Sequence, residues 1–332
     1  MLDPRPHRIP RTPPRATPAR GARARVARPA ALLLAGALGY VACSQDAGEA
    51  LAELERLAFV PSGECVLFGR SGLRLSCAND RALLVDRFEV TRAAWRAWTA
   101  RQPALDPTLA EVVASWPAQT STWPASFMTQ AEARSFAASR GMRLLSAREW
   151  LRVACDTRGL AHPWGNREAS SVANTLNLGL RHPLPVGTFE QGRTPLATYD
   201  MTGNVWEWVE DPILSLPGEE DSDPGIAWAM GGSYLSRLRR IHDLDREEGH
   251  LVLDEQSLDP RTRSIDVGLR CAADAEAYLT ANARRLGGEA ERERLLAIGA
   301  AWGHNAVPLL ADLAGRGDAA PGLSILLEGA RR

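Results

Sequence analysis

The sequence predicts an α+β domain that is rich in loops and carries a small helical appendage at its C-terminus. Capping signals mark three helix starts between residues 91 and 155. After Cys155 no helical pattern is found for over a hundred residues, a stretch rich in Gly, Pro, Asn and Asp with tryptophans scattered through it. Because tryptophan buries a large apolar ring system, we expect these loops to pack against a core rather than to be disordered.

The chain of 332 residues has a net charge of −1, but its charges are unevenly distributed. Residues 1–43 hold eight arginines and one acidic residue, Asp3, so the remainder is mildly acidic, which argues against nucleic acid as a partner. Residues 1–28 are rich in Arg, Pro and Ala and have too few apolar residues for a core. The apolar run after them is too short for a membrane span but typical of a signal peptide.

The apolar run stops at Ala42 and Cys43, and the chain turns polar at once. A small residue before Cys resembles the bacterial lipobox, in which the cysteine is lipidated and becomes the new N-terminus, although Tyr40 stands where Leu is usual. We therefore expect residues 1–43 to be a signal peptide and the mature protein to be a lipoprotein of the bacterial cell envelope, anchored in the membrane through Cys43. The alternative is an ordinary signal peptide, which would make the protein periplasmic or secreted.

Cys43 aside, the chain has four cysteines: Cys65, Cys77, Cys155 and Cys271. In an exported protein they indicate two disulfides, for which three connectivities exist. The segment ECVLFGRSGLRLSC predicts a hairpin centred on Ser71, which places Cys65 opposite Cys77, close enough to bridge. The remaining pair is Cys155–Cys271, which would join distant parts of the chain.

The organisation along the mature chain follows from helix signals. Residues 44–57 predict a short helical tether, and residues 58–273 a globular domain. Within it, helices are expected after Thr91, after Thr129 in a capping box with Glu132, and after Ser146 in a second box with Glu149. Residues 274–332 predict amphipathic helices separated by glycines and proline.

The stretch YDMTGNVWEWVED, residues 199–211, places the carboxylate of Glu207 between two tryptophans that should be buried. A buried carboxylate needs a partner. The segment is therefore either a core strand with an ion or hydrogen-bond network, or part of a functional site.

Seven segments, taken in chain order, carry a resemblance to a known family: AFVPSGE, VDRFEVTRAAW, RLLSAREWLRVAC, HPWGN, YDMTGNVWEWVED, MGGSY and VGLRC. Together they resemble the formylglycine-generating-enzyme (sulfatase-modifying factor) family, whose domain is a variant of the C-type-lectin fold, over residues 58–273. The resemblance implies an α+β domain with much loop. It also implies a disulfide at the positions of Cys155 and Cys271, the pair that the hairpin leaves over.

The resemblance further implies a structural calcium ion wrapped by the segment that ends in WEW. The ligands would be the side chains of Asp200 and Glu207 and the carbonyls of Gly203 and Val205, which are the oxygen ligands that a hard cation takes. The alternative is that Glu207 pairs with a buried arginine and Asp200 caps a turn. A second calcium site of the family would use Asn174 and the carbonyl of Thr175.

The founding enzymes of the family oxidise a substrate cysteine to formylglycine with copper held by two cysteines just after the GGSY segment. A thiolate pair suits monovalent copper. The corresponding positions here are Ser236 and Ile241, so neither copper nor that activity is expected. A related branch, the ergothioneine-type sulfoxide synthases, holds non-haem iron through three histidines of an additional N-terminal helical domain, for which residues 44–57 leave no room.

A candidate ligand pocket surrounds these positions; its residues are Tyr234, Ser236, Arg237, His242 and Asp243. We expect a binding or scaffold module that contacts a protein, peptide or glycan of the cell envelope. The arginines of the RLRR run, residues 237–240, would bind an anionic ligand or form a surface ion-pair patch. The opposing hypothesis is a metal-dependent oxidoreductase with the metal on His242, Asp243 or Asp245, and a third is a structural subunit of an envelope complex.

Overall fold

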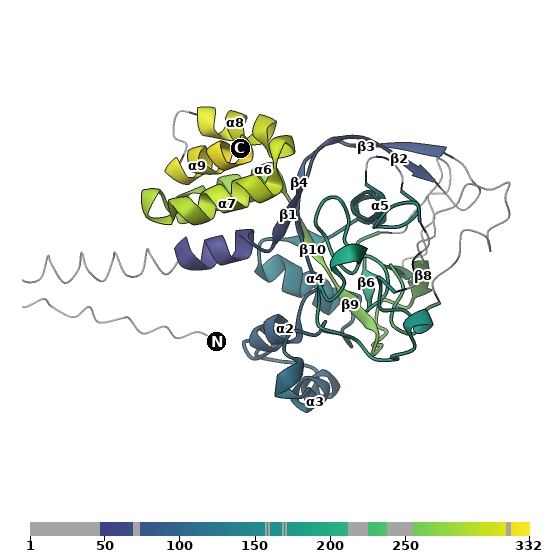
Figure 1. Ribbon diagram of the computed structural model, residues 1–332. Helices are drawn as coiled ribbons and strands as arrows, with labels where there is room; N and C mark the ends of the chain where they lie inside the picture. The colour runs from purple at the N-terminus through teal and green to yellow at the C-terminus, as the bar shows by residue number, and fades with distance from the viewer. Residues whose placement is uncertain are drawn as a thin grey trace, which may run out of the picture. The chain divides into compact units, whose positions relative to one another are not determined.

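The computed structural model describes residues 47–332 except 69–73, 157, 159, 168, 170, 212–224, 238–254 and 317–319. These residues form two four-stranded sheets, a separate hairpin and several helices (Figure 1). Cys43, Ile241, His242 and Asp243, which the sequence singled out, lie outside the described residues.

The first sheet is antiparallel throughout, with the order β1-β4-β10-β5. Its strands are β1 (Leu57–Val60), β4 (Leu83–Asp86), β5 (Arg143–Leu144) and β10 (Cys271–Asp274). Successive side chains of a strand point to opposite faces. Leu84 and Ala273 belong to one hydrophobic cluster, whereas Val85 and Ala272 belong to another, so this sheet has a core on each side.

The second sheet carries the WEW segment in its interior, with the order β8-β7-β6-β9. Its strands are β6 (Trp206–Trp208), β7 (Ala227–Met230), β8 (Glu255–Leu258) and β9 (Val267–Leu269). Strand β6 pairs antiparallel with β7 and parallel with β9, and all three of its residues are buried. The strand is therefore enclosed on both faces, which explains two bulky aromatic side chains around one carboxylate.

A two-stranded hairpin stands apart from both sheets. It consists of β2 (Gly63–Phe68) and β3 (Arg74–Asn79), with Cys65 directly opposite Cys77. The predicted strand register is thereby confirmed. The side chains of these two cysteines are not among those described, so the disulfide between them stays a prediction.

The caps predicted from the sequence are confirmed at all three helix starts. The helices in this part of the chain are α2 (Arg92–Thr99), α3 (Pro107–Ser115), α4 (Gln130–Ser139) and α5 (Ala147–Cys155). The side chains of Thr91, Thr129 and Ser146 accept hydrogen bonds from backbone amides of α2, α4 and α5, and the last two belong to capping boxes. Helix α3, capped by Asp106, is one that the sequence reading missed.

The C-terminal helices and the first described helix share the core of the domain. The C-terminal helices are α6 (Ala275–Asn282), α7 (Arg292–Trp302), α8 (Val307–Gly315) and α9 (Pro321–Ala330). Trp302 lies 6.0 Å from the ring of Phe59, measured between ring centroids, and its Nε1 donates to the carbonyl of Leu57 at 3.0 Å. Residues 47–54 form a helix whose Leu51 and Leu54 are buried in the same cluster, so in the structure this segment packs as part of the core.

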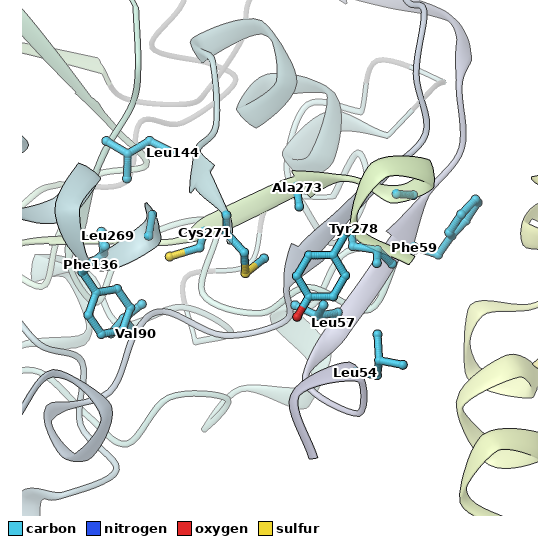
Figure 2. Packing of buried hydrophobic residues seen from close by; sticks show 14 of the residues in the cluster. Leu54, Leu57, Phe59, Val90, Phe136, Leu144, Leu269, Cys271, Ala273 and Tyr278 are labelled. Atoms are coloured by element: carbon cyan, nitrogen blue, oxygen red, sulfur yellow. The ribbon is translucent and has the colours of Figure 1, made fainter. Parts of the chain in front are cut away.

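Figure 2 shows how segments far apart in the sequence meet in this cluster. Leu54 and Leu57 lie near Tyr278 of α6, and Cys271 of β10 lies among apolar side chains on the same side of the sheet. Among the described residues, no helix combines the length and the apolar character that crossing a membrane requires.

The predicted disulfide between Cys155 and Cys271 is wrong in this structure, because both are buried free thiols. The alternation of β10 explains why. Cys271 faces the cluster that contains Leu84 and Leu144, whereas Cys155 belongs to the cluster of the opposite face, with Ala272. The first sheet therefore separates the two sulfurs, and burial raises the pKa of each thiol.

Close packing of α7 against α9 yields a stability prediction. A β-carbon built at Gly299 would lie 2.1 Å from the carbonyl oxygen of Leu326, so Gly299→Ala must push the helices apart. We expect a loss of about 1–3 kcal/mol in the free energy of unfolding, measured by urea denaturation. Gly315→Ala is the matched control, since its β-carbon would meet nothing within 4 Å, and it should change stability by less than about 0.5 kcal/mol. Equal effects of the two variants would contradict the close approach.

Candidate functional site

Glu207 and Arg270 form an ion pair at the centre of the domain. Nη2 of Arg270 lies 2.6 Å from Oε1 of Glu207, and the two side chains are 0% and 1% exposed. Nε of Arg270 lies 3.0 Å from Oε2, which also accepts from Nε1 of Trp150 at 2.7 Å. Both carboxylate oxygens are therefore held by donors.

Arg270 reaches beyond Glu207 to two other segments. Its Nη1 donates to the carbonyl of Asp86 at the end of β4, at 2.9 Å, and its Nη2 to the carbonyl of Tyr199, at 2.7 Å. One guanidinium thus ties both sheets to the loop that precedes β6. Burial, the largest single influence, lowers the pKa of Arg270, but Glu207 and then Glu89 and Asp200 together raise it above its ordinary value.

Two further carboxyl groups lie in the same buried region. Asp200 accepts from the amide of Gly187 at 2.6 Å. Glu89, which the sequence reading did not single out, accepts from the amide of Val205 at 3.0 Å and from Nδ2 of Asn204 at 2.6 Å. Burial, as the main cause, raises the pKa of Glu89 well above its ordinary value and that of Asp200 to about 6. Burial in this cluster therefore favours the protonated, neutral forms of Glu89 and Asp200.

The residues around Glu207 do not fit the calcium ion that the family resemblance implied. A cation ligand needs a free oxygen lone pair, whereas both oxygens of Glu207 face hydrogen-bond donors and a guanidinium already supplies the positive charge. The structure instead has the other alternative, with Glu207 paired to a buried arginine and Asp200 accepting from a turn amide. Gly203 donates its amide to the carbonyl of Gly231 at 2.9 Å, which fixes the loop before β6.

The region of the second implied calcium site, unlike that of Glu207, contains buried oxygens without hydrogen-bond partners among the described residues. The Oδ1 atom of Asn174 and the hydroxyls of Thr175 and Thr202 are buried and have no hydrogen-bond partner within the described part of the chain. The Nδ2 atom of Asn174 is engaged, with the carbonyl of His182 at 3.0 Å and Oδ1 of Asn204 at 3.1 Å. Oxygens left without partners fit a bound cation or water, so Asn174 is a better candidate ligand than Glu207.

The candidate pocket contains a compact turn at Ser233–Ser236. The hydroxyl of Ser236 accepts from the amide of Ser233 at 2.9 Å, and the hydroxyl of Ser233 donates to Asp266 at 2.7 Å. The carbonyl of Ser236 accepts from the amide of Leu176 at 2.9 Å. The residue at the first copper-ligand position of the family is thus part of a hydrogen-bonded turn. Tyr234 is buried beside it, and Arg237 is exposed.

Sequence reasoning missed an aromatic and cationic group formed by Arg92, Trp116, Trp123 and His182. The guanidinium carbon of Arg92 lies 5.0 Å from the centroid of the Trp116 ring and 5.2 Å from that of Trp123. The Trp123 ring stacks on His182 at 5.5 Å. Burial first, and then the charge of Asp266, raises the pKa of Tyr234, while Arg92 lowers it, so these groups are electrostatic neighbours. Only the high tryptophan content hinted at such a group.

The histidines that the structure describes do not converge on one point. His162 stacks on Trp164 and His182 on Trp123, while His304 lies in the C-terminal helical region. Over the described residues, no group of three or more His, Cys, Asp and Glu side chains is arranged to hold a metal ion.

Comparison with known proteins places these observations in a family context. The model described as sulfatase-modifying factor enzyme 1-like domain matches residues 52–275. The hercynine oxygenase of Mycolicibacterium smegmatis is 32% identical over 163 residues, which are 46% of this chain and 37% of that protein. The inactive C-alpha-formylglycine-generating enzyme 2 of Bos taurus is 27% identical over 157 residues, which are 43% of this chain and 48% of the relative. The chain therefore spans less than half the length of these relatives.

Solved structures agree on the fold. PvdO from Pseudomonas aeruginosa superposes with a TM-score of 0.50 and 19% identity, covering 66% of this chain and 94% of its own. Treponema denticola variable protein 1 superposes with a TM-score of 0.51 and 15% identity, with the same coverage of 66% and 94%. At these identities the likeness shows the architecture alone.

The buried ion pair predicts a large loss of stability when one partner is removed. Arg270→Met leaves the carboxylate of Glu207 buried without its cation and also frees the carbonyls of Asp86 and Tyr199. We expect a loss of about 3–5 kcal/mol in the free energy of unfolding, measured by chemical denaturation. Arg261→Met is the control, because its ion pair with Asp259 is exposed and should matter little. A loss no larger than that of the control would show that the pair is not essential.

The buried carboxyl of Asp200 predicts a pH dependence. Its pKa is about 6 in the folded protein, against an ordinary value of 3.8, so the unfolded chain releases this proton first. The stabilising contribution of Asp200 is therefore complete below about pH 4 and is lost as the pH rises to about 6. Relative to the wild type, Asp200→Asn should gain about 2–3 kcal/mol across this window, measured by denaturation at several pH values. Above about pH 7 the two curves should run parallel, and parallel curves throughout would contradict the prediction.

Proposed function

The chain belongs to the family described by the sulfatase-modifying factor enzyme 1-like domain, and we propose that it is an exported binding or scaffold module without formylglycine-generating activity. The observation that carries the proposal is the side chain at position 236. In the copper-binding members that the sequence resembles, a cysteine stands at this position. Here a serine stands there, and its hydroxyl accepts a hydrogen bond within the Ser233–Ser236 turn.

The residues at the two copper-ligand positions do not fit monovalent copper. This ion prefers soft thiolate or thioether sulfur, whereas Ser236 offers a hard oxygen and Ile241 offers no donor atom. Both described free cysteines, Cys155 and Cys271, are buried in the core and belong to other elements. No step of an oxidation can be derived through copper with these residues.

Exposed apolar side chains support a peptide or protein as the partner. Leu235, Leu180 and Ile265 are 44%, 42% and 61% exposed. Leu235 is part of the Ser233–Ser236 turn, and Ile265 precedes Asp266, which accepts from Ser233. The segment with Leu180 follows Leu176, whose amide bonds to Ser236. Three hydrogen-bonded segments therefore each present one large apolar side chain, as surfaces that bind proteins do.

The name of one relative supports a binding or scaffold role, although it does not assign that role to this chain. A relative from Bos taurus is named an inactive C-alpha-formylglycine-generating enzyme 2, so this family includes proteins described as inactive. This chain covers 48% of that protein.

Export and anchoring belong to the same proposal. The apolar run before Cys43 supports a signal peptide, and the small residue before Cys43 supports lipidation at that cysteine. Mass spectrometry of the mature N-terminal peptide tests this, and an unmodified or internal Cys43 would contradict the lipid anchor.

We also propose that Asn174 and Thr175 form a calcium-binding site. A calcium-induced rise in melting temperature that Asn174→Ala abolishes is the corresponding test.

The competing function is a metal-dependent oxidoreductase with ligands other than cysteine. The observation that favours it is the 32% identity to a hercynine oxygenase. Its candidate ligands, His242, Asp243 and Asp245, lie outside the described residues. Metal analysis of protein purified from its native membrane separates the two functions, since stoichiometric iron or copper would favour the oxidoreductase.

The binding proposal predicts that the pure protein leaves a cysteine-containing sulfatase peptide unchanged. In the presence of copper(I) and oxygen, mass spectrometry should detect no aldehyde product, because the thiolate ligands are absent. Ser236→Ala serves as the matched variant: it should weaken the turn and lower the melting temperature slightly, and it should likewise give no aldehyde. Conversion of the peptide by the wild type would overturn the proposal.

A further inference from the structure

Arg92, at the start of α2, is held in position by hydrogen bonds and by two aromatic rings. Its amide donates to the carbonyl of Trp123 at 2.8 Å, and its Nη1 donates to the hydroxyl of Thr120 at 2.8 Å. The guanidinium lies against the rings of both Trp116 and Trp123. Aromatic faces of this kind attract a cation and fix its orientation.

The charge of Arg92 has no anionic partner within the described residues. Its described side-chain hydrogen bond goes to the neutral hydroxyl of Thr120, and its Nε is buried with no partner there. Three other arginines that are partly or fully buried have carboxylate partners: Arg140 has Asp86, Arg263 has Glu132 and Arg270 has Glu207. Arg96 instead donates to the backbone carbonyls of Val113 and Trp116. Arg92 differs from these, and a partly buried cation without a counter-ion is unfavourable.

The surroundings of Arg92 make its charge still less favourable. Burial, as the main cause, and the neighbouring Arg96 both lower its pKa. Arg92 is also the first residue of α2, whose N-terminal end carries a partial positive charge, and the first turn holds no acidic residue. An added anion would therefore relieve repulsion as well as form hydrogen bonds.

Arg92 is linked to two of the segments that carry the exposed apolar side chains. It and Asp266 act electrostatically on the same side chain, Tyr234, which directly precedes Leu235. On its other side, Trp123 stacks on His182, two residues after Leu180. Arg92 is thereby connected, through Tyr234 and Trp123, to the segments that carry Leu235 and Leu180.

We infer that Arg92 forms a carboxylate-binding subsite of this surface and receives an acidic side chain of a bound peptide that carries apolar residues next to it. The inference rests on the proposed binding function and names the chemistry of its partner. A planar guanidinium matches a carboxylate with two parallel hydrogen bonds. The exposed apolar groups of Leu180, Leu235 and Ile265 favour a peptide over an acidic glycan, which would offer them hydroxyls.

The test compares two short peptides, acetyl-Leu-Glu-Leu-amide and acetyl-Leu-Gln-Leu-amide, by isothermal titration of the full mature protein. The wild type should bind the glutamate peptide ~10-fold or more tightly than the glutamine peptide, because a hydrogen bond to a charged group is lost in the second. Arg92→Gln should bind both equally weakly. Arg92→Lys should keep part of the preference, which a purely structural role of Arg92 would not restore.

Arg101→Gln is the matched control. Arg101 is exposed just after the same helix, and its variant should retain the full preference for the glutamate peptide. Equal binding of the two peptides by the wild type, no binding of the glutamate peptide, or an equal loss in Arg101→Gln would each overturn the inference. Preferential binding of a methyl glucuronide over both peptides would also overturn it, by showing an acidic sugar as the ligand.

Two further outcomes separate this inference from the function on which it rests. The acidic run of residues 243–248, outside the described residues, offers an internal competitor in Asp243, Asp245, Glu247 and Glu248. A glutamate preference that appears only after these are replaced by amides would assign the site to this chain and overturn an external ligand. The binding function itself is tested by Leu235→Asp and Ile265→Asp, with Ile226→Asp as control, in capture of envelope proteins. If these variants leave capture unchanged while the wild type still prefers the glutamate peptide, the binding function is contradicted and the carboxylate-binding subsite is not.

Discussion

The buried ion pair of Glu207 and Arg270 is the interaction on which the rest of the domain depends. Removing two charges from water is costly, and mutual attraction offsets that cost only when every donor and acceptor is satisfied. Here Glu207 receives Arg270 and Trp150, and Arg270 also binds the carbonyls of Asp86 and Tyr199. These contacts hold the interior strand of one sheet to the end of a strand in the other, so the layer arrangement and the ion pair are mutually dependent.

The same ion pair determines which of the buried carboxyl groups has a cationic partner. Three carboxyl groups, those of Glu89, Asp200 and Glu207, share one guanidinium, and all are buried. Glu207 takes the guanidinium, whereas burial drives Glu89 and Asp200 toward their neutral forms. A protein of this family can therefore satisfy the WEW carboxylate with an arginine of its own chain. Asn174, whose Oδ1 has no hydrogen-bond partner within the described residues, is connected to these acids, because it donates to Asn204 and Asn204 donates to Glu89.

Local signals in the sequence predicted much of the fold, whereas the pairing of residues far apart in the sequence could not be predicted. The helix caps at Thr91, Thr129 and Ser146 and the register of Cys65 with Cys77 follow from residues close together in the sequence, and all were confirmed. Arg270 lies 63 residues from Glu207, and no spacing rule identifies it as the partner. The pairing of Cys155 with Cys271 failed for a related reason, because cysteine counting does not reveal which face of a strand a side chain occupies. Arg92 likewise became visible only once its loop was folded around it.

Backbone hydrogen bonds join the framework of the ion pair to the proposed binding surface. From Glu207 the chain runs back to Asn204, whose carbonyl accepts from the amide of Tyr234 at 3.0 Å, and Gly203 donates to Gly231. Main-chain groups, which any residue provides, thus link the Ser233–Ser236 turn to the segment before β6, while the hydroxyls of Ser233 and Ser236 hold the turn itself. The side chain at position 236 takes no part in these main-chain bonds. The fold can therefore persist while the side chains of this proposed surface vary.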